Sequence, residues 1–366
     1  IAVLDAGFVG GKTVGINDGL DTIITRNFVE GGSNVYQGSS HGFSVLSTMA
    51  AYQPEVFIGT APQASYALIK TEKELSETPE EMMNWIAGAE FADSIGADII
   101  NSSLGYSTFD DPNDDYSVSD LDGRTSIISL GALAAARTGM LVVTSAGNAG
   151  GSSWDKLTFP ADADSILTVG SVTQYGVASS FSSRGYTVDG RVKPNVCARG
   201  EGAVVYRSDG TLAYANGTSF SSPIMAGAAA CLWSTVPDAT AQEVIEALEV
   251  SASHYYQHNP RIGYGIPNLG FAHRYLSTIV DGKLPEIVVY PNPFPDYISL
   301  FLPDGEALDI HLELRDLNQR TVAVATLESK RYKALWSPGD NIAAGTYILY
   351  IERGGRTQMQ RVIKLL

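Results

Sequence analysis

The sequence predicts an α/β protein with a doubly wound, mostly parallel sheet and helices on both faces, followed by a small all-β sandwich. Up to about residue 275, short continuous apolar runs alternate with helical segments, as in parallel strands that are buried on both faces. Asp281-Gly282-Lys283-Leu284-Pro285 then has the composition of a linker, and short alternating runs separated by turns follow it. We therefore expect a larger domain at 1–280, a linker at 281–288 and a smaller domain at 289–366.

The elements of the larger domain follow from apolar runs and helix start signals. Ile1–Leu4 is the expected first strand, and His41–Ala50 the expected first helix. Thr78-Pro79-Glu80-Glu81 combines a capping box with proline at the first helical position, which predicts a helix from there to about residue 96. A later helix at 224–233 is expected to hold Pro223 in its first turn. The other strands are expected at 56–59, 66–70, 97–101, 140–144, 166–172 and 177–181, and the other helices at 127–137 and 241–250.

Composition restricts the classes of partner. The chain has 366 residues and a formal net charge of −16, which argues against nucleic acid and is compatible with a soluble extracellular protein. No apolar run approaches the ~18 residues of a membrane span, so no transmembrane segment is expected. Because the chain opens inside a strand, we expect that upstream segments have been removed or are missing. Cys197 and Cys231 lie in apolar sequence, which predicts two buried thiols rather than a bridge.

One segment is unusually acidic. Phe109-Asp110-Asp111-Pro112-Asn113-Asp114-Asp115 is followed closely by Asp120-Leu121-Asp122-Gly123. Carboxylates suit a hard cation, but their spacing does not match the EF-hand loop. Two interpretations stay open, a solvated surface loop and a site for structural calcium, and the sequence does not identify metal ligands.

Four polar residues occupy positions typical of catalytic groups. Asp5 follows the first strand, at the edge where open α/β sheets place their sites. His41 begins a helix, and Asn148 lies in a glycine-rich turn after a strand. Ser219 is expected at a helix N-terminus, where the macrodipole favours negative charge. Alone, Asp5 would more often cap a loop, a histidine at a helix start is usually structural, and asparagine is common in turns. Together with Ser219 they supply a nucleophile, a base, an orienting acid and an oxyanion donor.

The order Asp, His, Asn, Ser, with its flanking residues, resembles the subtilisin-like serine peptidases, the subtilase family. The resemblance covers roughly residues 1 to 275 and implies the subtilisin-like fold for the larger domain. The matching motifs are Asp5-Ala6-Gly7, His41-Gly42 with Val45, Ser103-Leu104-Gly105, Ser145-Ala146-Gly147-Asn148, and Asn216-Gly217-Thr218-Ser219 with Ser222-Pro223.

This resemblance implies a serine endopeptidase that acts on protein or peptide substrates and requires no cofactor for its chemistry. Ser219 would attack the peptide carbonyl, and His41 would accept its proton and later deliver it to the leaving amine. Asp5 would orient the imidazole and stabilise the imidazolium. Asn148 would donate its side-chain amide to the developing oxyanion.

The resemblance also implies a substrate cleft lined by two strands. An extended peptide can add to such edges through main-chain hydrogen bonds. The residues that would bind substrate are Ser103, Leu104 and Gly105 on one side and Ser145, Ala146 and Gly147 on the other.

Two positions depart from the family's usual pattern. Ala6 follows Asp5 where the family more often has threonine or serine, and the carboxylate itself is retained. Phe220 follows Ser219 where many relatives carry methionine, which predicts slower inactivation by oxidants.

The smaller domain is predicted to be an immunoglobulin-like β-sandwich, with strands at 287–290, 297–302, 308–314, 321–326 and 346–351. Tyr290–Phe294, Ala344–Ile351 and Gln360–Leu366 resemble the C-terminal sorting domain of the type IX secretion system of Bacteroidetes. That resemblance implies secretion machinery as a partner and a secreted or cell-surface location beyond the bacterial outer membrane. A packing or substrate-binding sandwich remains the alternative, in a surface binding protein built on a subtilase scaffold.

Overall fold

A computed structural model describes residues 1–11, 23–255, 257–281, 287–290, 292–302, 308–328, 333–339 and 341–365. The chain divides into two compact units, Ile1–Leu276 and Ser277–Leu366, and the division falls inside helix α6 (Leu269–Asp281). Residues 282–286 of the expected linker lie outside the described residues, as do Pro291 and Leu366 of the expected sorting motifs.

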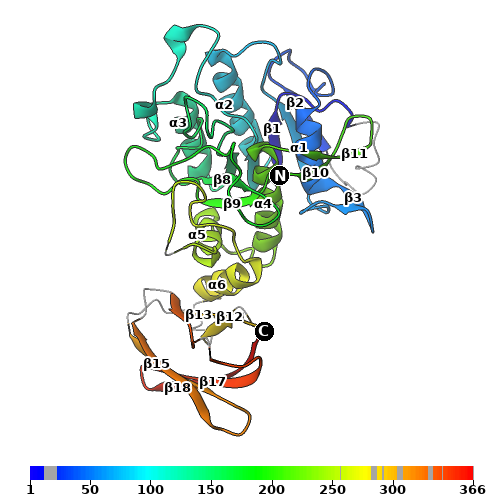
Figure 1. The fold of residues 1–366 in the computed structure, drawn as a ribbon. Helices are drawn as coiled ribbons and strands as arrows, with labels where there is room; N and C mark the ends of the chain where they lie inside the picture. Colours follow the sequence, from blue (N-terminus) through cyan, green and yellow to red (C-terminus); the bar gives the residue numbers. More distant parts are fainter. Residues whose placement is uncertain are drawn as a thin grey trace. The chain divides into compact units, whose positions relative to one another are not determined.

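The first unit is built on a seven-stranded sheet of order β2-β5-β1-β6-β7-β8-β9 (Figure 1). Every pair in this sheet is parallel. From β1 the chain adds strands first on one side and then on the other, so the strand order reverses at β1 and β6, where doubly wound folds place their sites. The strands are β1 (Ala2–Asp5), β2 (Ile23–Asn27), β5 (Tyr66–Lys70), β6 (Ile99–Ser102), β7 (Leu141–Ser145), β8 (Leu167–Val172) and β9 (Val196–Arg199).

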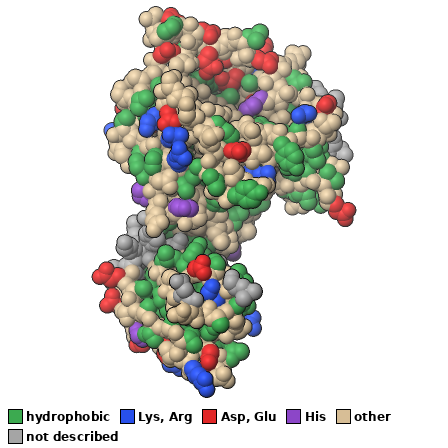
Figure 2. Space-filling view, viewed as in Figure 1, with side chains coloured by type: hydrophobic (Ala, Val, Ile, Leu, Met, Phe, Trp, Pro, Cys, Tyr) green, Lys and Arg blue, Asp and Glu red, His purple; other side chains and the backbone are tan. Residues whose placement is uncertain are grey.

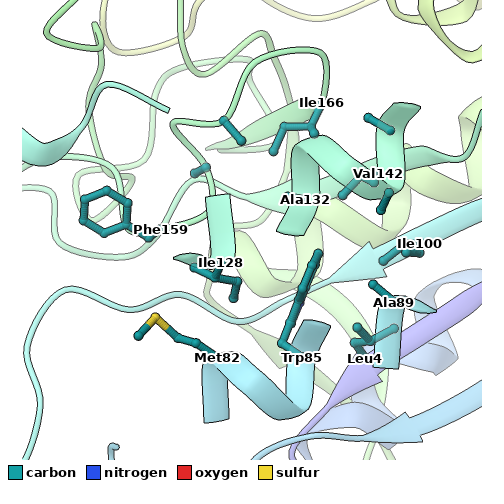
Figure 3. Packing of buried hydrophobic residues seen from close by; sticks show 14 of the residues in the cluster. Leu4, Met82, Trp85, Ala89, Ile100, Ile128, Ala132, Val142, Phe159 and Ile166 are labelled. Carbon is teal, nitrogen blue, oxygen red and sulfur yellow. The ribbon is translucent and has the colours of Figure 1, made fainter. Parts of the chain in front are cut away.

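Helices cover both faces of this sheet. On one face, α2 (Pro79–Ser94) and α3 (Ile127–Arg137) pack over a core that contains Leu4, Trp85 and Ile128 (Figure 3). The other face carries α1 (His41–Ala50) and α4 (Thr218–Ser234), and α5 (Ala241–Ser251) packs against α4. The predicted doubly wound class is therefore confirmed.

Local signals explain several helix boundaries. The capping box of Thr78 and Glu81 is present at the start of α2, with Pro79 at its first position, as predicted. Small residues let α4 lie close to its neighbours: a Cβ on Gly227 would come within 2.1 Å of the Thr60 hydroxyl oxygen. The prediction for the start of α4 was wrong, because the helix begins at Thr218 and Pro223 lies inside it.

Other expectations need correction. Residues 177–181 form no strand and contribute only the isolated bridge between Val172 and Ala178. Residues 57–58 (β4) pair with β3 (Tyr52–Gln53) outside the main sheet. The hairpin of β10 (Ala203–Tyr206) and β11 (Leu212–Ala215) was not predicted, nor were β2, β9 and α6. Strand β11 has four residues and is partly exposed along its length, so it carries little periodicity.

The cysteine prediction was half right. Cys197 is buried and burial raises the pKa of its thiol to about 12, whereas Cys231 is exposed on α4. Both thiols are free, so neither forms a bridge. Within the described residues, no helix combines the length and the apolar character needed to cross a bilayer.

The second unit contains two antiparallel sheets around one core. One sheet has the order β15-β14-β17-β18 and the other β12-β13-β16. Phe294, Leu312 and Trp336 are among the buried residues of their shared core, which supports the sandwich expected from alternation. Strands β16 and β18 were not predicted. The strands are β12 (Val288–Tyr290), β13 (Ile298–Phe301), β14 (Asp309–Arg315), β15 (Thr321–Glu328), β16 (Lys333–Trp336), β17 (Gly345–Arg353) and β18 (Arg356–Lys364).

Candidate active site

Asp5 and His41 are brought together although 36 residues separate them. Asp5 is the last residue of β1 and fully buried, and His41 is the first residue of α1. The Nδ1 atom of His41 lies 2.8 Å from Asp5 Oδ1. This approach requires glycine at position 42, because a Cβ there would lie 2.6 Å from the Gly7 carbonyl oxygen and 2.8 Å from the Asp5 Cβ.

The electrostatics of this pair suit a proton acceptor. The charge of Asp5, followed by its hydrogen bond, raises the pKa of His41 against the opposing effect of burial. Since Asp5 accepts at Nδ1, the neutral ring carries its proton there and leaves Nε2 as the basic nitrogen. The His41 side chain keeps 35% exposure, so this nitrogen can be reached from outside.

Asp5 is incompletely satisfied. Its Oδ1 accepts from the Ala6 backbone N–H at 2.8 Å as well as from His41, whereas the buried Oδ2 has no hydrogen-bond partner in the described part of the chain. The side chain of Ala6 has no hydroxyl to offer.

Ser219 lies in the first turn of α4, directly after the helix start. Gly217, with φ of +154°, turns the chain into this helix. Pro223 has no N–H to donate to the carbonyl of Ser219, four residues earlier. The Ser103 hydroxyl takes that place and donates to Ser219 O at 2.8 Å. Because of the proline inside the helix, the backbone of the expected nucleophile is bonded to the expected substrate strand.

The Ser219 hydroxyl does not bond to histidine in this structure. Among the described residues its one hydrogen-bond partner is Ser103 O, at 3.4 Å. The His41 ring lies beside Phe220, with ring centroids 6.1 Å apart. Because Phe220 directly follows Ser219, His41 and Ser219 lie in the same region of the structure. Catalytic hydrogen bonds are often long or misaligned without substrate and tighten when it binds. Rotation about χ1 of Ser219 would turn its hydroxyl away from this weak contact.

Asn148 is held in a defined orientation. Its Oδ1 accepts from the Thr218 backbone N–H at 2.8 Å and from the Thr218 hydroxyl at 3.0 Å. A backbone N–H can only donate, so this fixes Oδ1 towards Thr218 and leaves Nδ2 as the outward end of the amide. Thr218 Oγ1 in turn accepts from the Gly147 backbone N–H at 3.2 Å. Thr218 thus joins the turn at Asn148 to the start of α4.

The two expected substrate strands differ in their available main-chain groups. Ala146 and Gly147 already use theirs: Ala146 N–H donates to Val169 O, Ala146 O accepts from Thr158 N–H, and Gly147 O accepts from Ser183 N–H. In contrast, the backbone groups of Leu104 and Gly105 form no hydrogen bond with the described residues. The main-chain groups of Leu104 and Gly105 are therefore available to pair with a peptide, whereas the bonded groups of Ala146 and Gly147 are not.

Several carboxylates of the acidic segment bond within the loop, whereas Asp110 accepts from the Glu77 backbone N–H at 3.2 Å. Asp111 caps the short 3-10 helix at 112–114, and Asp115 accepts from the Phe109 backbone N–H at 2.7 Å. Asp120 forms a capping box with Ser117, and Asp122 accepts from the backbone N–H groups of residues 124 and 125. In the described portions of the chain, no group of three or more His, Cys, Asp or Glu residues is arranged to hold a metal ion.

A second set of carboxylates lies beside the expected substrate strand. Burial, with a contribution from Glu81, raises the pKa of Glu72 to about 8, and Tyr106 donates a hydrogen bond to this carboxyl group. Burial and the charges of Glu81 and Asp110 raise the pKa of Glu77 to about 7. Figure 2 shows acidic side chains gathered beside a hollow on the surface of the first unit.

Three contributions to the site were missed from the sequence. These are Thr218, which anchors Asn148, Thr158, which bonds to Ala146, and the contact of Glu72 with Tyr106. A hydroxyl residue directly before the nucleophile was the signal available for Thr218. Glu72 and Tyr106 lie 34 positions apart, and Thr158 contacts Gly105 and Gly147 only through the folded chain, so no local pattern records either arrangement.

Comparison with known proteins identifies the family of this chain. The model of the subtilase family matches residues 1–266. Subtilisin E of Bacillus subtilis (strain 168) is 33% identical over 266 residues, which cover 69% of this chain and 64% of that protein. Subtilisin of Bacillus pumilus is 32% identical, over 69% of this chain and 88% of that protein. The chain thus spans slightly less than two thirds of some of its relatives.

Solved structures agree on the fold. The structure of the patellamide maturation protease PatA covers 75% of this chain and 96% of its own, with a TM-score of 0.59 and 25% identity. MycP1 from Mycobacterium smegmatis covers 74% of this chain and 78% of its own, with a TM-score of 0.59 and 22% identity. The family model, the relatives and the parallel sheet together show that this chain belongs to the subtilase family.

Proposed function

We propose that the protein is a serine endopeptidase that cleaves protein or peptide substrates by acyl transfer to Ser219. The observation that carries the proposal is the buried Asp5 bonded to His41 at 2.8 Å, next to a helix start that presents Ser219. Asp5 fixes the tautomer of His41, whose Nε2 accepts the Ser219 proton and later delivers it to the leaving amine. No cofactor takes part in these steps.

Asn148 supplies the oxyanion donor in this mechanism. With Oδ1 anchored by Thr218, Nδ2 is available to donate to the charge that develops on the carbonyl oxygen. The backbone N–H of Ser219, in the first turn of α4, is the second donor, and the helix N-terminus favours negative charge there. These groups are fixed before the reaction, so little reorganisation is needed when the charge forms.

Substrate would bind as an extended strand along Ser103, Leu104 and Gly105. The main-chain groups of Leu104 and Gly105 are available for pairing. Ser145, Ala146 and Gly147 would form the opposite wall by contact rather than by hydrogen bonding, since Ala146 and Gly147 are already bonded elsewhere.

Labelling with a fluorophosphonate probe tests this function. The probe reacts with an activated serine, so we expect labelling of the wild type and none of Ser219→Ala. His41→Ala should lose most of the labelling, because the serine loses its base. Ser234→Ala is a matched control, since Ser234 lies exposed on the same helix and its hydroxyl, among the described residues, bonds only to Cys231 O. A wild type that folds but is not labelled would favour a surface binding protein on a subtilase scaffold.

The second unit is proposed to be a type IX sorting domain, with the domains divided at 1–280, 281–288 and 289–366. The motifs at 290–294, 344–351 and 360–366 support this, and two antiparallel sheets around one core are compatible with it. The protein would then be secreted or held at the surface of a Bacteroidetes cell. Expression of the full chain in a host with and without the type IX machinery tests the idea. The protein should be exported when the machinery is present and should stay in the periplasm when the machinery is absent. Equal export from both hosts would refute it.

A further inference from the structure

The reacting carbonyl has a narrow range of positions in this site. Ser219 is bonded to Ser103 through both its carbonyl and its hydroxyl, and the expected oxyanion donor, Asn148, directly follows Gly147. A carbonyl within reach of Ser219 Oγ and Asn148 Nδ2 therefore lies between the segments that end at Gly105 and Gly147. The side chain next to that carbonyl, called P1, must point between these two glycines. We call the space between Leu104-Gly105 and Ala146-Gly147 the P1 slot.

Thr158 occupies the inner end of the P1 slot. A Cβ on Gly105 would lie only 2.1 Å from Thr158 Oγ1, and a Cβ on Gly147 would lie 2.6 Å from the same oxygen. The two glycines therefore both lie against one threonine side chain. Ser183 closes the same end, with its hydroxyl 2.8 Å from the position of a Cβ on Gly147.

The backbone holds Thr158 in place. Its N–H donates to Ala146 O at 3.2 Å, and its carbonyl accepts from Ala161 N–H at 2.9 Å. The next residue, Phe159, forms two backbone hydrogen bonds with Tyr106, and its fully buried ring belongs to the hydrophobic core that also contains Trp85 and Ile128 (Figure 3). Thr158 is thus fixed to both walls of the slot and cannot withdraw without disturbing the core.

The hydroxyl of Thr158 makes no hydrogen bond with any described residue. Oγ1 is buried and has no partner among the residues that the structure describes, although an unpaired buried hydroxyl costs about 1–3 kcal/mol. Hydrogen bonding within the chain therefore does not account for threonine at this position. The Thr158 side chain instead contributes volume. It lies so close to Gly105 and Gly147 that neither position has room for a side chain larger than that of glycine.

We propose that Thr158 shortens the P1 slot and restricts the peptidase to small P1 side chains, namely those of glycine, alanine and serine. This inference rests on the proposed function and adds the substrate class. A bulky side chain would have to overlap Thr158 Oγ1 or displace the backbone at Gly105 or Gly147, both of which close packing resists.

Two peptide anilides that differ only at P1, alanine or phenylalanine, test the proposal through kcat/KM. We expect the wild type to favour alanine by at least about tenfold, since even one methylene in a fitted pocket changes selectivity by roughly 10–200-fold. Thr158→Gly should lower the alanine-to-phenylalanine ratio by at least about tenfold. Thr158→Val, which keeps the volume and removes the hydroxyl, should leave the ratio within about threefold of the wild type.

The outcomes separate the proposal from the function on which it rests. A wild type that cleaves phenylalanine as well as alanine would overturn the proposal without any variant. So would a labelled Thr158→Gly with an unchanged ratio, and Thr158→Ala gives the same readout if the glycine variant does not fold. A large change in the ratio for Thr158→Val would show that the hydroxyl, not the volume, selects P1. Absence of labelling and of cleavage in the folded wild type would instead refute the peptidase function.

Discussion

Replacement of Thr218 by valine tests whether the oxyanion donor needs its anchor. Valine has nearly the same shape, and Thr218 is fully buried, so packing is preserved. The substitution removes the 3.0 Å bond from the hydroxyl to Asn148 Oδ1 and the 3.2 Å bond from Gly147 N–H to the hydroxyl. The 2.8 Å bond from the Thr218 backbone N–H to Asn148 remains.

The expected magnitudes follow from these contacts. Gly147 N–H would be left buried and unpaired, so the free energy of unfolding should fall by about 1–3 kcal/mol. Complete loss of the oxyanion amide costs about 10²–10³ in kcat, a magnitude measured at the equivalent asparagine of a subtilisin rather than worked from this structure. Because Asn148 keeps one of its two anchors, we expect about a tenfold lower kcat, with KM changed by less than about threefold.

Steady-state kinetics on a peptide anilide, with active sites counted by fluorophosphonate labelling, give both constants. Thr218→Ser keeps the hydroxyl and should stay within about threefold of the wild-type kcat. In the double variant with Asn148→Ala, the two losses should not multiply, because Thr218 acts through Asn148. A wild-type kcat in Thr218→Val, or fully multiplicative losses in the double variant, would refute the anchoring role.

Four further outcomes are expected. Asp5→Asn should lower kcat by a factor on the order of 10⁴ and shift the acidic limb of the pH–rate profile to lower pH, because the carboxylate raises the pKa of the histidine; an unshifted limb would contradict this. Burial raises the pKa of Glu72 to about 8 from 4.5, so the folded state keeps a proton that the unfolded state releases. Its stabilising contribution is therefore complete below about pH 4.5 and lost as the pH rises through about 8, by at most about 1.4 kcal/mol per pH unit. Denaturation at several pH values should show that the free energy of unfolding depends less on pH in Glu72→Gln than in the wild type. Trp85→Phe removes a 2.9 Å hydrogen bond to a buried serine hydroxyl and should lower the free energy of unfolding in urea by about 1–3 kcal/mol. With Phe220 after the nucleophile, activity should persist in a peroxide time course, and rapid loss would show that another residue is the oxidised one.

The larger features of the first unit could be predicted from sequence because each has a local cause. Buried parallel strands are continuous apolar runs, and α2 begins where Thr78, Pro79 and Glu81 specify it. The residues Asp5, His41, Asn148 and Ser219 were identified from motifs whose chain order is shared by a family. Where periodicity was weak, as in β2 and the β10–β11 hairpin, the prediction failed.

The start of α4 shows how tertiary contacts overrode a local rule. Proline is usually confined to the first turn of a helix, so the sequence placed the start near Pro223. In the structure the helix extends back to Thr218, and the Ser103 hydroxyl bonds to the carbonyl that proline leaves without a donor. The compensating group is 116 residues away, so no window of sequence could have shown it.

By itself, the sequence determined the fold class, the family and the identity of the candidate catalytic residues, since strand burial, capping and motif spacing are written in neighbouring residues. Tertiary structure alone decided how these residues are held: Asp5 with one oxygen unsatisfied, Asn148 anchored by Thr218, and Thr158 between two glycines. The reason is that parallel strands deliver distant segments to one edge of the sheet. Hydrogen bonds and steric limits at that edge depend on distances of a few tenths of an ångström, which composition and periodicity do not encode.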